Sequence, residues 1–180
     1  MDQAEWLTIN FTLPKEPSRT RVSVWRKLKR AGSVNIGQSI WVLPPSDEHY
    51  SFFEEIAAEV EENNGEAYIM KSYFTREKNI KIVCELFNEA RNEEYKEFLG
   101  KCEDFFQEIE KETAKMNFTF AEIEENEHEL EKLNIWLKRI IERDFFNASL
   151  QKESRNMLDE CKERLSNYSN KVYELSCSID

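Results

Sequence analysis

The pattern of hydrophobic and polar positions divides the chain near Phe74 into a region of short elements and a region of long helices. Every Pro and every Gly lies in the first hundred residues, and Gly100 is the last of them. Since Pro and Gly mark turns, the first region predicts a mixture of short strands and helices, and the second predicts long helices. We therefore expect an α+β protein with a domain over residues 1–75 and a helical bundle packed on it over residues 76–180.

Four short runs of β-favoured residues in the first region predict strands. They are Trp6–Leu13, Ser33–Ile36, Ser39–Leu43 and Ala67–Phe74. The dipeptide Gly37-Gln38 between the middle two suits a tight hairpin.

Two amphipathic helices are predicted between these strands. The first starts at Pro17-Ser18, with Ser18 as the N-cap, and Gly32 closes it. Ser46-Asp47 can cap the second, which ends at Asn64-Gly65 and whose apolar face consists of Phe53, Ile56, Ala57 and Val60. The order β-α-β-β-α-β is that of a ferredoxin-like sheet with two helices on one face.

Three helices are predicted in the second region. The first covers about Glu77 to Lys115. The second starts where Thr119 and Glu122 form a capping box, with Phe118 and Ile123 as a hydrophobic staple across it, and it breaks near residues 143–147. The last carries a stripe at three-four spacing, as expected for helices that pack on a neighbour: Leu158, Cys161, Leu165, Tyr168, Val172 and Leu175.

Charge is unevenly distributed along the chain. The part through Pro45 has seven basic and three acidic residues, a balance of +4, so the remainder carries −15 of the overall −11. A basic patch on an acidic protein points to its partners rather than to its fold.

The basic segment Arg19–Arg30 is the most informative local feature. At 100° per residue, Arg19, Arg26 and Arg30 share one stripe, flanked by Lys27 and Lys29. The apolar side chains Val24, Trp25, Leu28 and Ala31 are expected on the opposite side, against the sheet. Such a ridge can contact phosphates, and the alternative is a solvated face paired with the acidic second region.

The residues that could carry other chemistry favour structural roles. Trp25, Trp41, Phe52 and Phe53 occupy apolar positions and are predicted as core residues rather than a base-stacking platform. The four cysteines lack a C-x-x-C pair and are predicted to be reduced core residues.

No catalytic residue, metal site or cofactor is predicted. The pair Glu125 and His128 has a ligand-like spacing, but His49 lacks a second such Glu, so a solvated face is the expected role. Two histidines in the whole chain disfavour Ser-His or Cys-His catalysis, and no Gly-rich phosphate loop occurs. The sequence has no membrane-length apolar run and opens without a signal-like segment, so we expect a cytoplasmic protein that does not bind a membrane.

Two blocks of residues resemble the N-terminal region of the ChrB chromate-resistance regulators. They are Val24-Trp-Arg26 with Leu28-Lys-Arg30, and Ile40-Trp-Val-Leu-Pro44. PaaX-type repressors carry a similar pair. The similarity to ChrB extends over nearly the whole chain through Trp6-Leu, Leu13-Pro14, Glu16-Pro-Ser-Arg19, Arg21-Val, Gly32, Gly65-Glu-Ala67, Phe87-Asn-x-x-Arg91, Tyr95, Glu122-x-x-Glu125, Leu130-x-x-Leu133, Trp136-Leu-x-x-Ile140 and Arg143-Asp144.

The resemblance implies a transcription regulator whose N-terminal region contacts DNA. The DNA-binding residues it suggests lie in the matched basic block: Arg19, Arg21, Arg26, Lys29 and Arg30, with Lys27 beside them. Long ChrB proteins have a further C-terminal region associated with the chromate response, which this sequence does not include. A related fold in small CRISPR-associated nucleases places a metal-binding Asp at the end of the first strand, where this chain reads Asn10-Phe-Thr-Leu13, so metal-dependent cleavage is disfavoured.

The leading hypothesis is therefore a homodimeric regulator that binds duplex DNA through the Arg19–Arg30 helix, with a link to chromate resistance. The runner-up is a non-enzymatic adaptor that binds another protein through its helices and never contacts DNA. An enzyme acting on chromate or on a nucleic acid is the third and least supported hypothesis.

Overall fold

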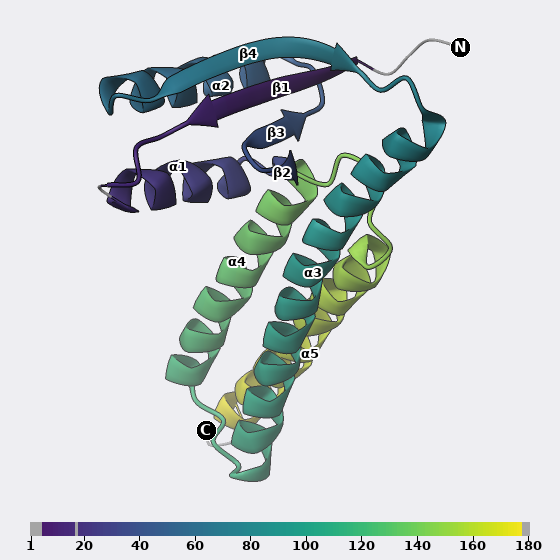
Figure 1. Ribbon diagram of the computed structural model, residues 1–180. Coiled ribbons are helices and arrows are strands. Elements are labelled where there is room, and N and C mark those ends of the chain that lie inside the picture. Colours follow the sequence, from purple (N-terminus) through teal and green to yellow (C-terminus); the bar gives the residue numbers. More distant parts are fainter. Residues whose placement is uncertain (1–4, 17, 178–180) are drawn as a thin grey trace. The chain divides into compact units, whose positions relative to one another are not determined.

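A computed structural model describes residues 5–16 and 18–177 (Figure 1). The elements in order are β1 (Glu5–Thr12), α1 (Ser18–Arg30), β2 (Val34–Gly37), β3 (Ile40–Leu43), α2 (Asp47–Glu62), β4 (Glu66–Tyr73), α3 (Glu77–Ala114), α4 (Phe120–Glu142) and α5 (Gln151–Cys177). This confirms the α+β class.

The chain forms two compact units. Unit 1 comprises Met1–Ala90 with Arg143–Phe146, and unit 2 comprises Arg91–Glu142 with Asn147–Asp180. The helix α3 continues from one unit into the other. The predicted division into a domain over residues 1–75 and a helical bundle over residues 76–180 stays a prediction.

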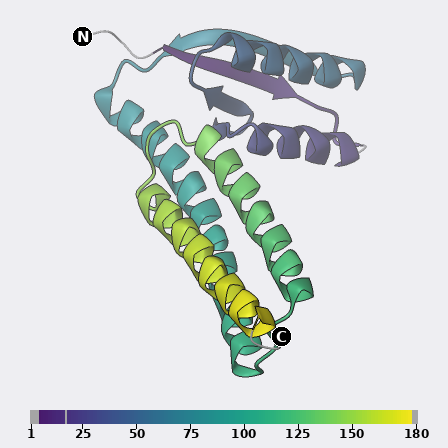
Figure 2. The ribbon, with the colours of Figure 1, turned by 180° about the vertical axis from the view of Figure 1, so that it is seen from behind.

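Unit 1 contains a four-stranded antiparallel sheet in the order β2-β3-β1-β4. The central strand β1 is buried from Trp6 to Ile9, so both of its faces are covered. Since side chains alternate along a strand, Leu7 and Ile9 lie on one face and Trp6 on the other. The helices α1 and α2 cover the face of Leu7 and Ile9, and Figure 2 shows α2 in front of β1 and β4.

Local sequence signals fix the ends of these helices. Gly32 adopts φ +83° after α1, and the amide of Ser33 donates to the carbonyl of Leu28 at 3.1 Å, closing the last turn. At the start of α2, the Ser46 hydroxyl accepts from the amide of His49 at 3.0 Å. The predicted Gly32 stop and Ser46 cap are confirmed; α1 starts at Ser18, and the neighbouring Pro17 lies outside the described residues.

An aromatic cluster covers the other face of β1 within unit 1. The ring of Trp6 lies 5.9 Å from Phe87 of α3 and 5.7 Å from Phe146, measured between centroids. Phe87 also contacts Phe145 at 5.8 Å. Residues 143–146, predicted only as a break between two helices, thus contribute to the core of unit 1.

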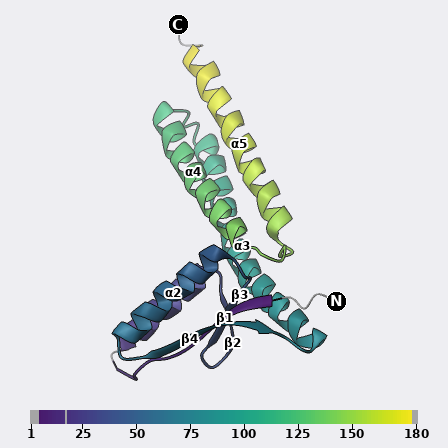
Figure 3. The same cartoon turned by 90° about the horizontal axis from the view of Figure 1, so that it is seen from above.

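Unit 2 is a bundle of α4, α5 and the later part of α3, which run side by side (Figures 1 and 3). Its core includes most of the predicted apolar stripes: Tyr95, Phe98, Cys102, Phe105 and Ile109 from α3; Ile123, Leu133, Leu137 and Ile140 from α4; Leu158, Cys161, Leu165, Tyr168 and Val172 from α5. The three predicted helices are therefore confirmed.

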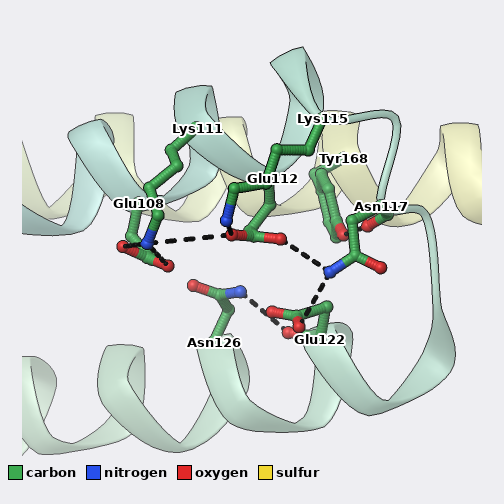
Figure 4. A network of polar contacts seen from close by, with 8 residues as sticks. All are labelled: Glu108, Lys111, Glu112, Lys115, Asn117, Glu122, Asn126 and Tyr168. Atoms are coloured by element: carbon green, nitrogen blue, oxygen red, sulfur yellow. Dashed lines mark hydrogen bonds and ion pairs between the residues drawn. The ribbon is translucent and has the colours of Figure 1, made fainter.

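A polar network surrounds the connection between α3 and α4 (Figure 4). The carboxylate of Glu112, which is almost fully buried, accepts from the Asn117 side-chain amide at 2.6 Å and from Lys115 Nζ at 2.8 Å. The same amide donates to Glu122 at 3.0 Å, and the Tyr168 hydroxyl donates to the Asn117 carbonyl. The predicted cap is present, since the Glu122 amide donates to the Thr119 hydroxyl at 3.3 Å.

Three predicted core positions are wrong. Trp25 is 51% exposed, because it lies at the edge of the buried face of α1 rather than over the sheet. Leu175 is 45% exposed and Cys177 is exposed at the end of α5, beyond the last core contact of that helix at Val172.

Candidate nucleic-acid interface

The helix α1 is held to unit 1 by a narrow apolar face. Val24 and Leu28 are fully buried, one helical turn apart. All six basic residues predicted to bind DNA are exposed: Arg19, Arg21, Arg26, Lys27, Lys29 and Arg30. The structure therefore presents them to solvent on one helix and divides them among three sides of it.

The outer side carries Arg19, Arg26 and Arg30, the stripe that the helical spacing predicts. Among the described residues none of these guanidinium groups has an ion-pair partner, in contrast to most lysines of α3. A guanidinium group is permanently charged and carries its N–H donors in a planar fork that matches phosphate oxygens. The outer side thus provides three unneutralised cations suited to a polyanion.

The side toward α2 is neutralised. Lys27 Nζ lies 2.7 Å from a carboxylate oxygen of Glu59, and the other oxygen of Glu59 accepts from the Ser23 hydroxyl at 3.0 Å. On the same side of α1, the Thr20 hydroxyl donates to the side chain of Asn63, which follows α2. Lys27 is therefore bound within unit 1, and its partner Glu59 could not be predicted from the spacing of α1 alone.

The third side of α1 faces an open groove of about 690 Å³. Arg21, Trp25 and Lys29 line it from successive turns, four residues apart. The opposite wall comes from the end of β1 and the β2–β3 hairpin, and comprises Phe11, Thr12, Leu13, Asn35, Gln38, Ser39 and Trp41. No carboxylate is among these lining residues in the part of the chain that the structure describes.

Sequence reasoning named the cations of this groove but missed its shape. The Lys29 ammonium lies 5.8 Å from the centroid of the Trp41 ring, a cation–π arrangement that joins the helix to the sheet. The spacing of Trp25, four residues from Arg21 and four from Lys29, placed all three on one side of the helix. This spacing could be read from the sequence, whereas the approach of the β2–β3 hairpin to α1 depends on tertiary packing.

Other kinds of site have less support. Within residues 5–16 and 18–177 no group of three or more His, Cys, Asp and Glu side chains is placed to hold a metal ion. Over the same residues, no helix is both long and apolar enough to cross a lipid bilayer.

Two cysteines are shielded from solvent in the core of unit 2. Cys102 and Cys161 lie together in the core of unit 2, and both are fully buried. The hydrogen bond with Cys161 and burial together raise the pKa of the Cys102 thiol. A raised pKa disfavours the reactive thiolate, so Cys102 lacks the electropositive, accessible setting of a catalytic cysteine.

Comparison with known families decides the relationship of the chain. The family model described as "Protein ChrB, N-terminal" matches residues 21–178, which is nearly the whole length. The chain belongs to this ChrB N-terminal family. No curated protein matches the sequence. The ChrB match includes both the groove residues of α1 and the outer residues Arg26 and Arg30, and it starts after Arg19.

Proposed function

We propose that this ChrB-family protein is a transcription regulator that binds duplex DNA through the outer side of α1. The observation that carries the proposal is the unneutralised stripe of Arg19, Arg26 and Arg30 on an otherwise acidic chain of net charge −11. A chain with this balance needs a local cationic surface to approach phosphates. The stripe supplies one, with Arg21 and Lys29 on the adjacent groove side.

The arrangement supports phosphate contacts along one helix. Arg19 to Arg30 span twelve residues of α1, and the eleven rises of 1.5 Å between them make about 16 Å of helix. Phosphates on one strand of B-DNA follow each other at about 3.4 Å along the axis, so the stripe can reach several of them. These contacts would position the protein, and sequence readout would need further contacts with base edges.

Affinity for duplex DNA at several salt concentrations tests the proposal. We expect the binding constant to fall about tenfold or more between about 50 and 200 mM salt, because each phosphate contact releases counterions. The double variant Arg26→Ala, Arg30→Ala should bind duplex DNA more weakly than the wild-type protein at every salt concentration. An adaptor without DNA binding, the alternative, predicts no binding at any salt.

The adaptor alternative has one observation in its favour. A groove of about 230 Å³ between α3 and α4 in unit 2 is lined mainly by acidic side chains, with Lys101 as the exception among its charged residues. The carboxylates are Asp104, Glu108, Glu122, Glu125 and Glu129. Such a surface suits a basic segment of a protein partner better than a nucleic acid.

The family and the fold support three further parts of the proposal: the regulated process, the place of action and the arrangement of unit 1. We propose that the regulated process is chromate resistance, as the ChrB resemblance implies, and that the protein acts in the cytoplasm without catalysing a reaction. We also propose a ferredoxin-like arrangement for unit 1, supported by the β-α-β-β-α-β order and by the strand order β2-β3-β1-β4.

A homodimer is the expected form of the regulator. Apolar side chains gather near the start of α4 and the end of α5 in unit 2, where the rings of Phe120 and Tyr173 lie 5.3 Å apart. Phe120 is 50% exposed and Tyr173 is 56% exposed. Large apolar side chains of this kind are enriched where two copies of a chain meet, which supports this end of the bundle as the dimer surface.

A further inference from the structure

We infer that the groove beside α1 binds an unstacked nucleotide, with the base against Trp25 and the phosphates at Arg21 and Lys29. The inference rests on the proposed function in one respect, since it takes the ligand of α1 to be a polynucleotide. It goes beyond that proposal by assigning a second surface of the helix to single-stranded or locally unpaired DNA.

The first observation is the exposure of Trp25. An indole ring that leaves half of its surface in water forgoes about half of the stabilisation that full burial would give, although the sequence pattern had placed Trp25 in the core. Trp25 is one of the residues that line the groove. Exposed aromatic rings in cationic grooves stack on nucleic-acid bases whatever the sequence, because every base has a π face.

The second observation is the charge of the groove. Arg21 and Lys29 lie on either side of Trp25, one helical turn away in each direction. Neither has an ion-pair partner among the described residues, and Lys29 instead lies over the ring of Trp41. In a single strand, each planar base is carried by a sugar that is flanked by two anionic phosphates. An aromatic ring flanked by two cations is complementary to this arrangement.

The third observation is the chemistry of the opposite wall. Asn35, Gln38 and Ser39 line the groove from the hairpin, and each can both donate and accept hydrogen bonds. Gln38 is exposed, and the Asn35 amide donates to the Ile40 carbonyl at 3.2 Å. Such groups can bond the Watson–Crick edge of a base only when that edge is free of a pairing partner, which an unstacked nucleotide provides.

The size of the groove fits this occupant. Its volume of about 690 Å³ lies within the roughly 300–1,000 Å³ that small ligands occupy in proteins. A duplex, whose major groove alone is about 12 Å wide, is too large for a groove of this volume. The groove and the outer stripe therefore require different states of the nucleic acid.

Anisotropy of a fluorescently labelled oligo(dT) tests the inference on the full chain. We expect the wild-type protein to bind oligo(dT), and Trp25→Ala to weaken that binding by about tenfold or more, the usual loss for one stacked base. Trp25→Phe should restore most of the affinity because the phenyl ring still stacks. Arg19→Ala is the matched control on the outer side of the same helix, and it should change oligo(dT) binding by less than about threefold.

The same variants on a duplex separate this inference from the proposed function. Failure of the wild-type protein to bind oligo(dT), or equal binding by Trp25→Ala, overturns the inference even if the duplex is bound. Binding of oligo(dT) that depends on Trp25, with no duplex binding at any salt, supports the inference and overturns the proposed duplex contact. Circular dichroism of Trp25→Ala verifies that the helix is retained. If this variant loses helical structure, Lys29→Gln replaces it in the test. Weakened oligo(dT) binding by Lys29→Gln then supports the inference, and unchanged binding overturns it.

Discussion

Residue by residue, the pairing of each cation decides what α1 can bind. Lys27 and Arg26 are neighbours in sequence with the same formal charge, yet Glu59 neutralises Lys27 while Arg26 faces solvent without a described partner. The ion pair between Lys27 and Glu59, at 2.7 Å, must be broken before Lys27 can bind a phosphate. The sequence named the right group of cations, and only the position of α2 shows which of them are already occupied.

Glu112 provides a prediction at this scale. Hydrogen bonds from Lys115 and Asn117 hold the pKa of the Glu112 carboxyl below its ordinary value of 4.5. The folded chain therefore binds this proton less readily than the unfolded chain. The stabilisation is complete above pH 4.5, and it is lost as the pH falls through the lowered pKa of the folded state.

We expect Glu112→Gln to flatten the loss of stability on acidification below pH 4.5. Urea unfolding at a series of pH values measures this effect. Glu108→Gln is the control, because Glu108 is exposed and pairs with Lys111 at the surface. Identical acid dependence in Glu112→Gln and the wild-type protein would contradict the role assigned to the network.

At the scale of elements, the periodicity of the chain predicted the helices well and the irregular segments poorly. The predicted helix from Glu77 to Lys115 is observed as Glu77–Ala114, because its apolar stripe continues over about eight turns, from Ile80 to Ile109. Residues 143–146 read only as a helix break, although Phe145 and Phe146 belong to the core of unit 1. A contact between residues so far apart in sequence leaves no periodic signal, and the groove beside α1 was missed for the same reason.

Two glycines give opposite predictions about these elements. A methyl group added at Gly65 would clash with the carbonyl oxygen of Thr12, whereas one added at Gly100 meets nothing within 4 Å. Gly100 lies inside α3, where Ala is favoured over Gly by about 1 kcal/mol. We expect Gly100→Ala to raise the free energy of unfolding by about that amount and Gly65→Ala to lower it by more than about 1 kcal/mol.

Chemical denaturation of the two variants beside the wild-type protein measures both effects. Stabilisation by Gly65→Ala would contradict the close approach of β1 to the end of α2. A loss of stability in Gly100→Ala would contradict the open helical surface at that position.

At the scale of the whole molecule, charge and composition predicted two regions of different character, and the structure shows two compact units. Six of the seven cations of the N-terminal part lie on one exposed helix, whereas many of the acidic residues of α3 to α5 pair with lysines and arginines three or four residues away. These carboxylates are occupied locally, and among the described residues none of them pairs with Arg19, Arg26 or Arg30 of α1. The local pairs contribute little stability individually, since exposed pairs are worth about 0–1 kcal/mol.

The proposed homodimer is a prediction for the intact chain. Light scattering at micromolar concentration should give twice the chain mass of 21.5 kDa. Replacement of Phe120 and Tyr173 by Glu should give the mass of a single chain, because two charges would be buried at the proposed surface. Tyr68→Glu is the control, since Tyr68 is 59% exposed on β4 in unit 1. A wild-type monomer at this concentration would contradict the dimer.

The salt dependence of duplex-DNA binding by the triple variant Arg19→Ala, Arg26→Ala and Arg30→Ala tests the central claim most directly. Each phosphate contact contributes about 0.9 to the slope of log affinity against log salt, so the triple variant should lower its magnitude by about 2.7. Lys27→Ala should lower it by much less, because Glu59 already neutralises that lysine. Equal slopes for the wild-type protein and the triple variant would contradict the claim that this stripe contacts phosphates.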